Sequence, residues 1–197
     1  MKHLILLTTL VSFLVGCGSE ATRKGDMLFE QGKFKESIVA YNEYLSEHQA
    51  NVKTLYNRGR AYEELGKYDL ALKDFEGVLK LDEFNTNALL GMANVSYSKG
   101  NYSLALIQAG KALKLNENLS KAHFLEARSR HQLGYFEGAL ESYSLAVKLD
   151  RNFGEAYLYR GALKIQLNQG RKACEDFRKA SNLKIEDASG ALAKYCK

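Results

Sequence analysis

The chain has 197 residues, of which 46% are hydrophobic and 26% are charged; this is the balance of a folded domain and excludes a disordered chain. The formal net charge is +5, and because its Lys and Arg residues are scattered and form no run, the sequence does not predict nucleic-acid binding. The chain contains no proline, so we expect a mostly helical protein whose turns are made by glycine and asparagine.

The first residues, 1–16, have the pattern of a targeting segment. A short basic start precedes an apolar stretch, residues 4–15, which is too short to cross a membrane because a spanning helix takes about 20 apolar residues. The stretch ends in LVGC at residues 14–17, which resembles the bacterial lipobox. The resemblance implies cleavage after Gly16 and a lipid anchor of two or three acyl chains, such as palmitate, on Cys17. The alternative is an ordinary secretory signal in which the cysteine stands by chance.

The remainder of the chain repeats with a period of 34 residues. Glycines recur at this spacing, each is followed two positions later by an aromatic residue, and small residues recur in further columns. These columns are Gly32, Gly66, Gly100 and Gly134; Phe34, Tyr68, Tyr102 and Phe136; Gly25, Gly59, Ala93, Ala127 and Gly161; and Ser37, Ala71, Ala105, Ala139 and Ala173. They divide the chain, without an insertion, into five repeats: 18–51, 52–85, 86–119, 120–153 and 154–187.

Each repeat is predicted to contain two helices joined by a short inner turn. In the second repeat, residues 57–65 and 68–81 carry apolar side chains at helical spacing, and Gly66 supplies the left-handed conformation of the turn between them. The fifth repeat has Asn168 at the glycine position, so we expect an inner turn of different shape there. Between repeats, Asn85-Thr86 and Leu119-Ser120 are predicted to cap the next helix with a side chain.

The period, the helix–turn–helix unit and the columns of small and aromatic residues resemble the tetratricopeptide repeat, or TPR. The resemblance covers residues 18–187, and 52–85 match the pattern best. It implies an all-α fold, a right-handed α-solenoid of five stacked repeats whose first helices line a concave groove. The proline that often ends the second helix of the family's repeats is absent throughout.

A short capping helix is expected at residues 188–197, because such arrays need a cover for their open end. One helical stripe there contains Ala188, Ala191, Leu192, Tyr195 and Cys196. Cys174, on the second helix of the fifth repeat, should be a neighbour of Cys196. An exported protein would allow a disulfide between them, and the alternative is two buried free thiols.

The sequence shows no arrangement of residues suited to catalysis. His48, His123 and His131 are too few and too far apart for a metal site, and no zinc-binding motif accompanies them. We therefore expect no enzymatic activity, metal, cofactor or small-molecule substrate.

By the family resemblance, the groove is lined by exposed faces of the first helices, where aromatic and arginine side chains are typical anchors for a protein partner. Exposed Phe124, Leu158 and Ile165 would form an apolar strip for a peptide or helix of the partner. Alternatively, neighbouring repeats or a second copy of the chain bury some of these side chains. The predicted groove residues are Phe29, Tyr56, Arg60, Glu63, Asn94, Tyr97, Phe124, Arg128, His131, Leu158 and Ile165.

Some TPR proteins grip a C-terminal carboxylate with a set of lysines and asparagines. Only Asn57 matches that set here, while Gly91 and Leu125 occupy other key places, so this ligand is not expected.

Together these features predict a membrane-anchored scaffold or adaptor that binds another protein of the bacterial cell envelope. Gly18 and Ser19 after the lipidated cysteine resemble outer-membrane lipoproteins of enteric bacteria, which implies a location at the outer membrane, facing the periplasm. The alternative is a structural accessory subunit of a pilus, secretion or outer-membrane assembly machine.

Overall fold

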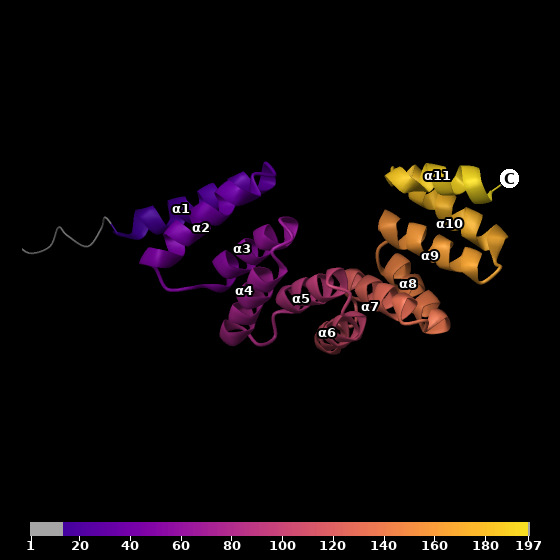
Figure 1. Ribbon diagram of the computed structural model, residues 1–197, viewed down its shortest axis with the longest axis horizontal. Coiled ribbons are helices and arrows are strands. Elements are labelled where there is room, and N and C mark those ends of the chain that lie inside the picture. The colour runs from indigo at the N-terminus through magenta and orange to yellow at the C-terminus, as the bar shows by residue number, and fades with distance from the viewer. Residues whose placement is uncertain (1–13, 197) are drawn as a thin grey trace, which may run out of the picture. The chain divides into compact units, whose positions relative to one another are not determined.

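The computed structural model describes residues 14–196, with side chains from residue 20 onward, and all of its regular structure is α-helical. The expected all-α class is confirmed. The chain divides into two compact units, unit 1 within Met1–Glu83 and unit 2 within Phe84–Lys197. Unit 1 contains α1 (Leu14–Glu30), α2 (Phe34–Glu47), α3 (Val52–Glu64) and α4 (Tyr68–Leu81) (Figure 1). Unit 2 contains α5 (Thr86–Ser98), α6 (Tyr102–Leu115), α7 (Ser120–Gln132), α8 (Phe136–Leu149), α9 (Gly154–Gln166), α10 (Gly170–Asn182) and α11 (Glu186–Tyr195).

The predicted signal peptide lies mostly in residues 1–13, outside the described residues. The backbone of Cys17 belongs to α1. Cleavage and lipid attachment therefore stay predictions. Among the described residues, none of the helices combines the length and the apolar character needed to cross a membrane.

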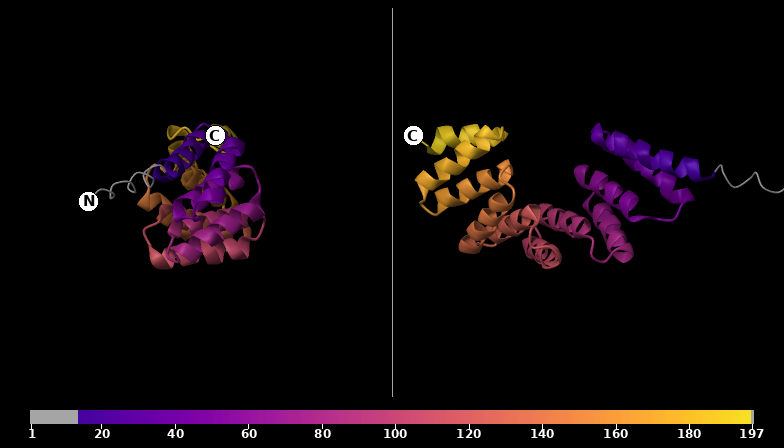
Figure 2. Two further views of the ribbon diagram at one scale, coloured as in Figure 1. Left: turned by 90° about the vertical axis from the view of Figure 1, so that its left-hand side faces the viewer. Right: turned by 180° about the vertical axis from the view of Figure 1, so that it is seen from behind.

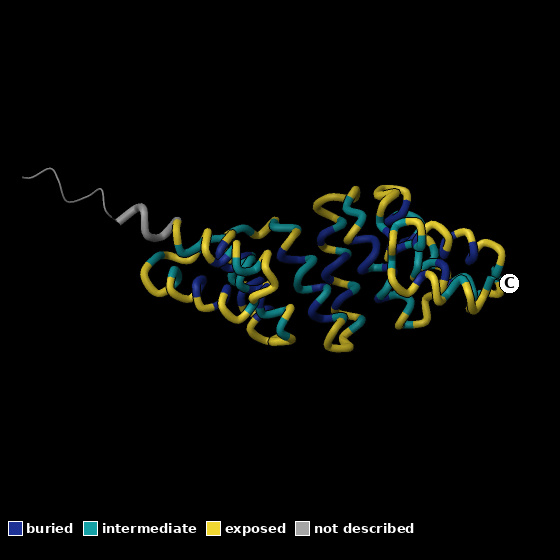
Figure 3. The backbone as a smooth tube through the Cα atoms, turned by 90° about the horizontal axis from the view of Figure 1, so that it is seen from above, coloured by how far each residue is buried: buried dark blue, intermediate teal, exposed yellow. Residues whose placement is uncertain are grey.

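The helices pack in consecutive pairs, because a small residue on the first helix of each repeat admits a side chain of the second. Gly25 on α1 faces the ring of Tyr41 on α2, and a Cβ atom at Gly25 would lie only 2.5 Å from Cε1 of that ring. Tyr41 is wholly buried as a result. Figure 3 shows buried and exposed positions alternating along the helices. The same relation joins Gly59 to Phe75 and Gly161 to Phe177.

The inner turns have one shape in all five repeats. Their four glycines have positive φ angles, between 67° and 80°, and Asn168 takes the same conformation with φ 57°. In repeat 2 the amide of Gly66 donates to Glu63 and that of Lys67 donates to Tyr62, which satisfies the last carbonyls of α3. Asn168 and Gln169 donate to Ile165 and Lys164 in the same pattern. The expectation of a different turn in repeat 5 was wrong, because asparagine tolerates this backbone region better than most residues.

The turns between repeats are capped less uniformly than predicted. The side chains of Asn51 and Asn85 accept hydrogen bonds from the amides of Thr54 and Ala88, at 2.9 and 3.0 Å, and so cap α3 and α5. The cap expected at Leu119-Ser120 does not form, because Leu119 is the N-cap residue of α7 and offers no side-chain acceptor.

An Arg–Asp pair with a buried aspartate is found in each unit. In unit 1, Arg58 Nη2 lies 2.6 Å and Nε 2.8 Å from the Asp74 carboxylate. In unit 2, Arg160 contacts Asp176 in the same way at 2.6 and 2.9 Å. Each pair joins the two helices of one repeat with the bidentate geometry that suits arginine.

The C-terminal helix α11 packs on α10 and covers the end of repeat 5 (Figure 2). It begins at Glu186, two residues before the expected start at 188, because a left-handed turn at Lys184 (φ 61°) joins α10 to it directly. Cys174 and Cys196 form a disulfide that ties α10 to the end of α11, with their Cα atoms 5.7 Å apart.

Candidate functional site

A cleft in unit 1, called cleft 1 below, opens between α1, the inner turn of repeat 1, α2 and α3. Its volume is about 520 Å³. It is lined by Asp26, Phe29, Glu30, Gly32, Phe34, Tyr41, Asn57, Arg60 and Glu64.

Asp26 forms the polar centre of cleft 1. Its Oδ1 accepts hydrogen bonds from the Tyr41 hydroxyl and the Asn57 amide, both at 2.8 Å, and Lys53 Nζ lies 2.6 Å from Oδ2. Burial alone would raise the pKa of Asp26, but the hydrogen bonds from Lys53, Tyr41 and Asn57 outweigh it and lower the pKa below its ordinary value of 3.8. Burial and the Asp26 carboxylate raise the pKa of Tyr41. Asp26 is thus a fixed anion that is already occupied by the protein's own donors.

Arg60 forms the exposed wall of cleft 1. Its guanidinium carbon lies 4.5 Å from the ring centroid of Phe29 and 6.0 Å from that of Tyr56. Phe29 in turn packs edge-on against Phe34 at 5.2 Å. Arg60 is exposed, so this stacked cation is available to an incoming group.

A second cleft, cleft 2, opens in unit 2 between α7, α9 and the turn that leads into α11. Its volume is about 360 Å³. It is lined by Phe124, Arg128, Glu155, Leu158, Tyr159, Lys184, Ile185, Glu186 and Asp187.

Arg128 lies among three aromatic rings beside cleft 2. Its guanidinium carbon is 3.9 Å from the ring centroid of Tyr97, 5.3 Å from that of Tyr159 and 5.6 Å from that of Phe124. These contacts hold a cation in a fixed place without an ion pair. Its Nε is buried and has no hydrogen-bond partner among the described residues.

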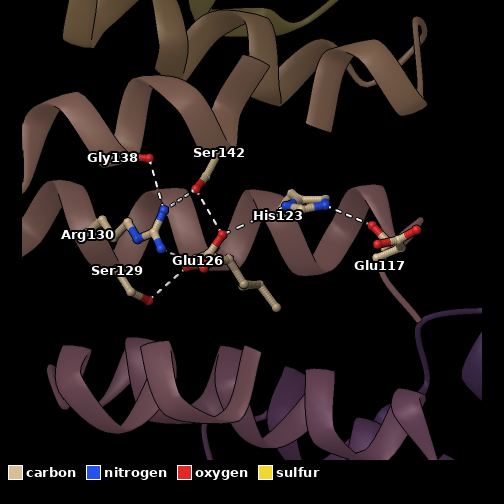
Figure 4. Close-up of polar contacts among 8 residues, drawn as sticks. Glu117, His123, Glu126, Ser129, Arg130, Gly138 and Ser142 are labelled. Carbon is tan, nitrogen blue, oxygen red and sulfur yellow. Dashed lines mark hydrogen bonds and ion pairs between the residues drawn. The ribbon is translucent and has the colours of Figure 1, made fainter. Parts of the chain in front are cut away.

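Another polar cluster on α7 is tied to the packing of α7 against α8 and lines neither cleft. Arg130 donates to Ser142 at 2.8 Å and to the Gly138 carbonyl at 3.2 Å, and it forms an ion pair with Glu126 at 2.9 Å (Figure 4). Ser142 donates to Glu126 at 2.8 Å. Nε2 of buried His123 lies 2.9 Å from the Glu117 carbonyl. The side chains of Arg130, Ser142 and Glu126 thus contact one another and join α7 to α8.

Comparison with known proteins identifies the repeats. Residues 52–85 and 120–153 each match the tetratricopeptide repeat family, and these ranges are the second and fourth of the five repeats. No curated protein sequence matches the chain. The protein is a tetratricopeptide-repeat protein.

Solved structures similar to this TPR protein share its fold at low sequence identity. MamA (41-end) from Desulfovibrio magneticus RS-1 has a TM-score of 0.73 and 21% identity, over 86% of this chain and 96% of that chain. TTC0263, a thermophilic TPR protein in Thermus thermophilus, has a TM-score of 0.73 and 18% identity, over 89% and 99%. YrrB, described as a TPR protein with an unusual peptide-binding site, has a TM-score of 0.64 and 20% identity, over 88% and 90%. The predicted TPR solenoid fold is confirmed.

The structure divides the predicted groove residues of the TPR array between the two clefts and their surroundings. Phe29 and Arg60 line cleft 1, and Phe124, Arg128 and Leu158 line cleft 2. The others line neither cleft: they are Tyr56, Glu63, Asn94, Tyr97, His131 and Ile165. Of these, Tyr56 and Tyr97 stack on the two cleft arginines, and His131 Nε2 lies 3.0 Å from Gln166 Oε1.

The exposed apolar strip expected of Phe124, Leu158 and Ile165 is not formed. Phe124 is only 8% exposed, because it packs against Phe153 at 4.7 Å and Tyr143 at 6.0 Å. Leu158 and Ile165 are half-buried. Phe124 therefore belongs to the core and contributes little surface to cleft 2, and the two rings that cover it, Tyr143 and Phe153, belong to its own repeat.

Sequence reasoning missed residues of cleft 2 for identifiable reasons. Tyr159 shares a repeat column with Asn57, Gly91 and Leu125, and that column was considered only for a C-terminal carboxylate ligand. The same column could have indicated Tyr159. The wall at residues 184–187 was missed because the 34-residue period does not predict the direct turn into α11.

Proposed function

We propose that this TPR protein is a lipid-anchored scaffold of the bacterial cell envelope that binds partner proteins through clefts 1 and 2. The observation that carries the proposal is the pair of clefts on the first helices of the repeats, each with an arginine held against aromatic rings. Arginine and aromatic side chains fixed at a concave surface are the usual anchors of protein interfaces.

The character of the clefts supports a peptide segment as the bound form. Volumes of about 520 and 360 Å³ suit a few side chains of a partner and not a whole domain surface. The structural similarity to YrrB, described as having a peptide-binding site, favours the same kind of ligand.

The sequence before the repeats supports attachment to the envelope. The lipobox-like LVGC segment would make an acylated Cys17 the first residue of the mature chain, directly before repeat 1, which begins at residue 18. The disulfide between Cys174 and Cys196 suits an oxidising compartment such as the periplasm. We place the protein at the outer membrane, facing the periplasm.

Partner binding can be tested by crosslinking in intact cells, followed by purification of the tagged full-length protein and mass spectrometry. Arg60→Glu alters cleft 1 and Leu158→Asp alters cleft 2. Lys73→Glu, exposed on α4 and outside both clefts, is the matched control. We expect wild type and control to enrich the same envelope protein and a cleft variant to lose it by at least about tenfold. Equal recovery with all variants would place the interaction elsewhere on the repeats.

Anchoring can be tested separately with Cys17→Ala. Wild type should incorporate a clickable palmitate analogue and sediment with membranes, and the variant should do neither. Labelling that persists in the variant would show that Cys17 is not the acylated residue.

A further inference from the structure

Repeats 1 and 4 place opposite charges at one equivalent position. Asp26 on α1 and Arg128 on α7 are three repeats apart, as are Tyr41 on α2 and Tyr143 on α8. In repeat 1 the Tyr41 hydroxyl donates to the Asp26 carboxylate at 2.8 Å. In repeat 4 the hydroxyl of the fully buried Tyr143 has no partner among the described residues.

The charge of the residue that pairs with Asp26 is also reversed three repeats later. Lys53, which pairs with Asp26 at 2.6 Å, has Glu155 as its equivalent three repeats later. Glu155 lines cleft 2, but within the described part of the chain it makes no ion pair with Arg128. Asp26 is therefore a carboxylate held by donors of repeats 1 and 2, whereas Arg128 at the equivalent position has no carboxylate paired with it among the described residues.

Arg128 also differs from the other arginines of α7 and α9. Arg130 pairs with Glu126 (Figure 4), and Arg160 pairs with Asp176. Arg128 is only partly exposed, yet it has aromatic neighbours alone, and its buried Nε lacks an acceptor. A partly desolvated cation without an acceptor is costly, and an anion that reaches the Arg128 guanidinium from cleft 2 would relieve that cost.

We propose that cleft 2 binds a carboxylate of a partner peptide on the Arg128 guanidinium, as the Asp26 carboxylate in cleft 1 is bound by Tyr41, Asn57 and Lys53. The proposal rests on the proposed function and names the chemistry that the cleft selects. Leu158 and Ile185 provide apolar walls for the residues beside the carboxylate. Glu155, Glu186 and Asp187 line the same cleft and disfavour further negative charge, so the ligand is an apolar segment with a single acid and not an acidic run.

The test measures binding of fluorescein-labelled nine-residue peptides of Leu, Ala and Ser to the detergent-purified full-length protein. One series is capped at both ends and has Asp, Glu, Asn or Gln at the centre. A second has no acidic side chain but a free C-terminus, which separates a side-chain carboxylate from a terminal one. A third has three central acids. The variants are Arg128→Met, Arg128→Lys and Glu155→Gln, with Arg178→Met, exposed on α10, as the matched control.

We expect wild type and Arg178→Met to bind at least one single-carboxylate series about tenfold more tightly than the neutral peptides. Arg128→Met should abolish this preference while weak apolar binding remains. Arg128→Lys should restore only part of it, because lysine lacks the planar fork. Glu155→Gln should strengthen binding of the acidic peptides.

Binding that is equal for acidic and neutral peptides, or a preference that survives in Arg128→Met, would overturn this inference and leave the proposed function standing. Tighter binding of the triacidic series than of the single-acid series would also contradict it. If no peptide binds and crosslinking in cells also finds no partner, the proposed function fails and this inference fails with it.

Discussion

Cleft 1 and cleft 2 occupy similar places on the repeats, but their centres are built differently. In cleft 1 the carboxylate of Asp26 is surrounded by Lys53, Tyr41 and Asn57, so its hydrogen bonds are made within the chain. In cleft 2 Arg128 is held by aromatic rings and lacks an anion among the described residues. Asp26 and Arg128 occupy the same position of the repeat. The carboxylate in cleft 1 is already bound by side chains of the protein, whereas the guanidinium in cleft 2 can bind a carboxylate of a ligand.

The largest expected effect concerns residues 184–187, which line cleft 2 and have no counterpart in cleft 1. The Cys174–Cys196 disulfide closes a loop with a sequence separation of 22 and holds α11, which carries Glu186 and Asp187 of cleft 2. Replacing both cysteines by serine should lower the free energy of unfolding of unit 2 by about 3 kcal/mol. Urea unfolding and hydrogen exchange of the α11 amides would measure this. Reduced wild type serves as the control and should resemble the double serine variant. Protection of the α11 amides in that variant equal to their protection in oxidised wild type would contradict the prediction.

A smaller effect tests how Tyr41 of repeat 1 and Tyr143 of repeat 4 pack against the first helix of their repeats. Gly25 lies against Tyr41, whereas Ala127 stands at the same position beside Tyr143. Gly25→Ala would place a Cβ atom 2.5 Å from a ring that its hydroxyl bond to Asp26 fixes, so we expect a loss of about 2 kcal/mol from overpacking. Ala127→Gly should cost about 1 kcal/mol through helix propensity. Thermal unfolding measures both, and a stabilising Gly25→Ala would show that the Tyr41 ring can move.

The elements of the fold that repeat were predictable, and those that occur once were not. The small residues of the columns were predicted to allow close helix pairs, and Gly25 and Gly59 lie where that expectation placed them. The turn at Lys184 has no equivalent in the other repeats, so periodicity could not indicate it. Asn168 adopts the left-handed turn conformation of the four glycines, so the backbone shape of the repeat persists where the glycine does not.

The clefts were less predictable than the fold because they depend on which side chains face one another. Column position placed Arg60 and Arg128 correctly on the first helices. It could not show that Phe124 is covered by Phe153, because Phe153 lies in the turn between repeats and belongs to no helix column. The partners of Asp26 come from two other helices, α2 and α3, and they meet because the helices stack and not because of local spacing.

A pair of Tyr→Phe substitutions tests the contrast between the clefts at the level of one hydroxyl group. Tyr41→Phe removes a made hydrogen bond and should cost about 1 kcal/mol, because the Asp26 carboxylate loses a buried donor. Tyr143→Phe removes a buried hydroxyl without a partner and should leave stability unchanged or slightly higher. Urea unfolding of the two variants measures the difference. An equal loss in both would mean that Tyr143 has an acceptor in solution, such as an ordered water.

The smallest expected effect is the pH dependence that Asp26 gives to unit 1. Burial alone would raise its pKa, but the hydrogen bonds from Lys53, Tyr41 and Asn57 lower it below 3.8, so the folded state binds the proton less readily than the unfolded state. The resulting stability is fully present above the unfolded pKa and is lost as pH falls through the folded pKa. Between about pH 5 and about pH 3, wild type should therefore lose more stability than Asp26→Asn. Arg128→Met in unit 2 should show the wild-type slope, because arginine stays charged throughout this range. Parallel curves for wild type and Asp26→Asn would show that Lys53, Tyr41 and Asn57 do not hold the carboxylate in solution, and the contrast between a closed cleft and an open one would then disappear.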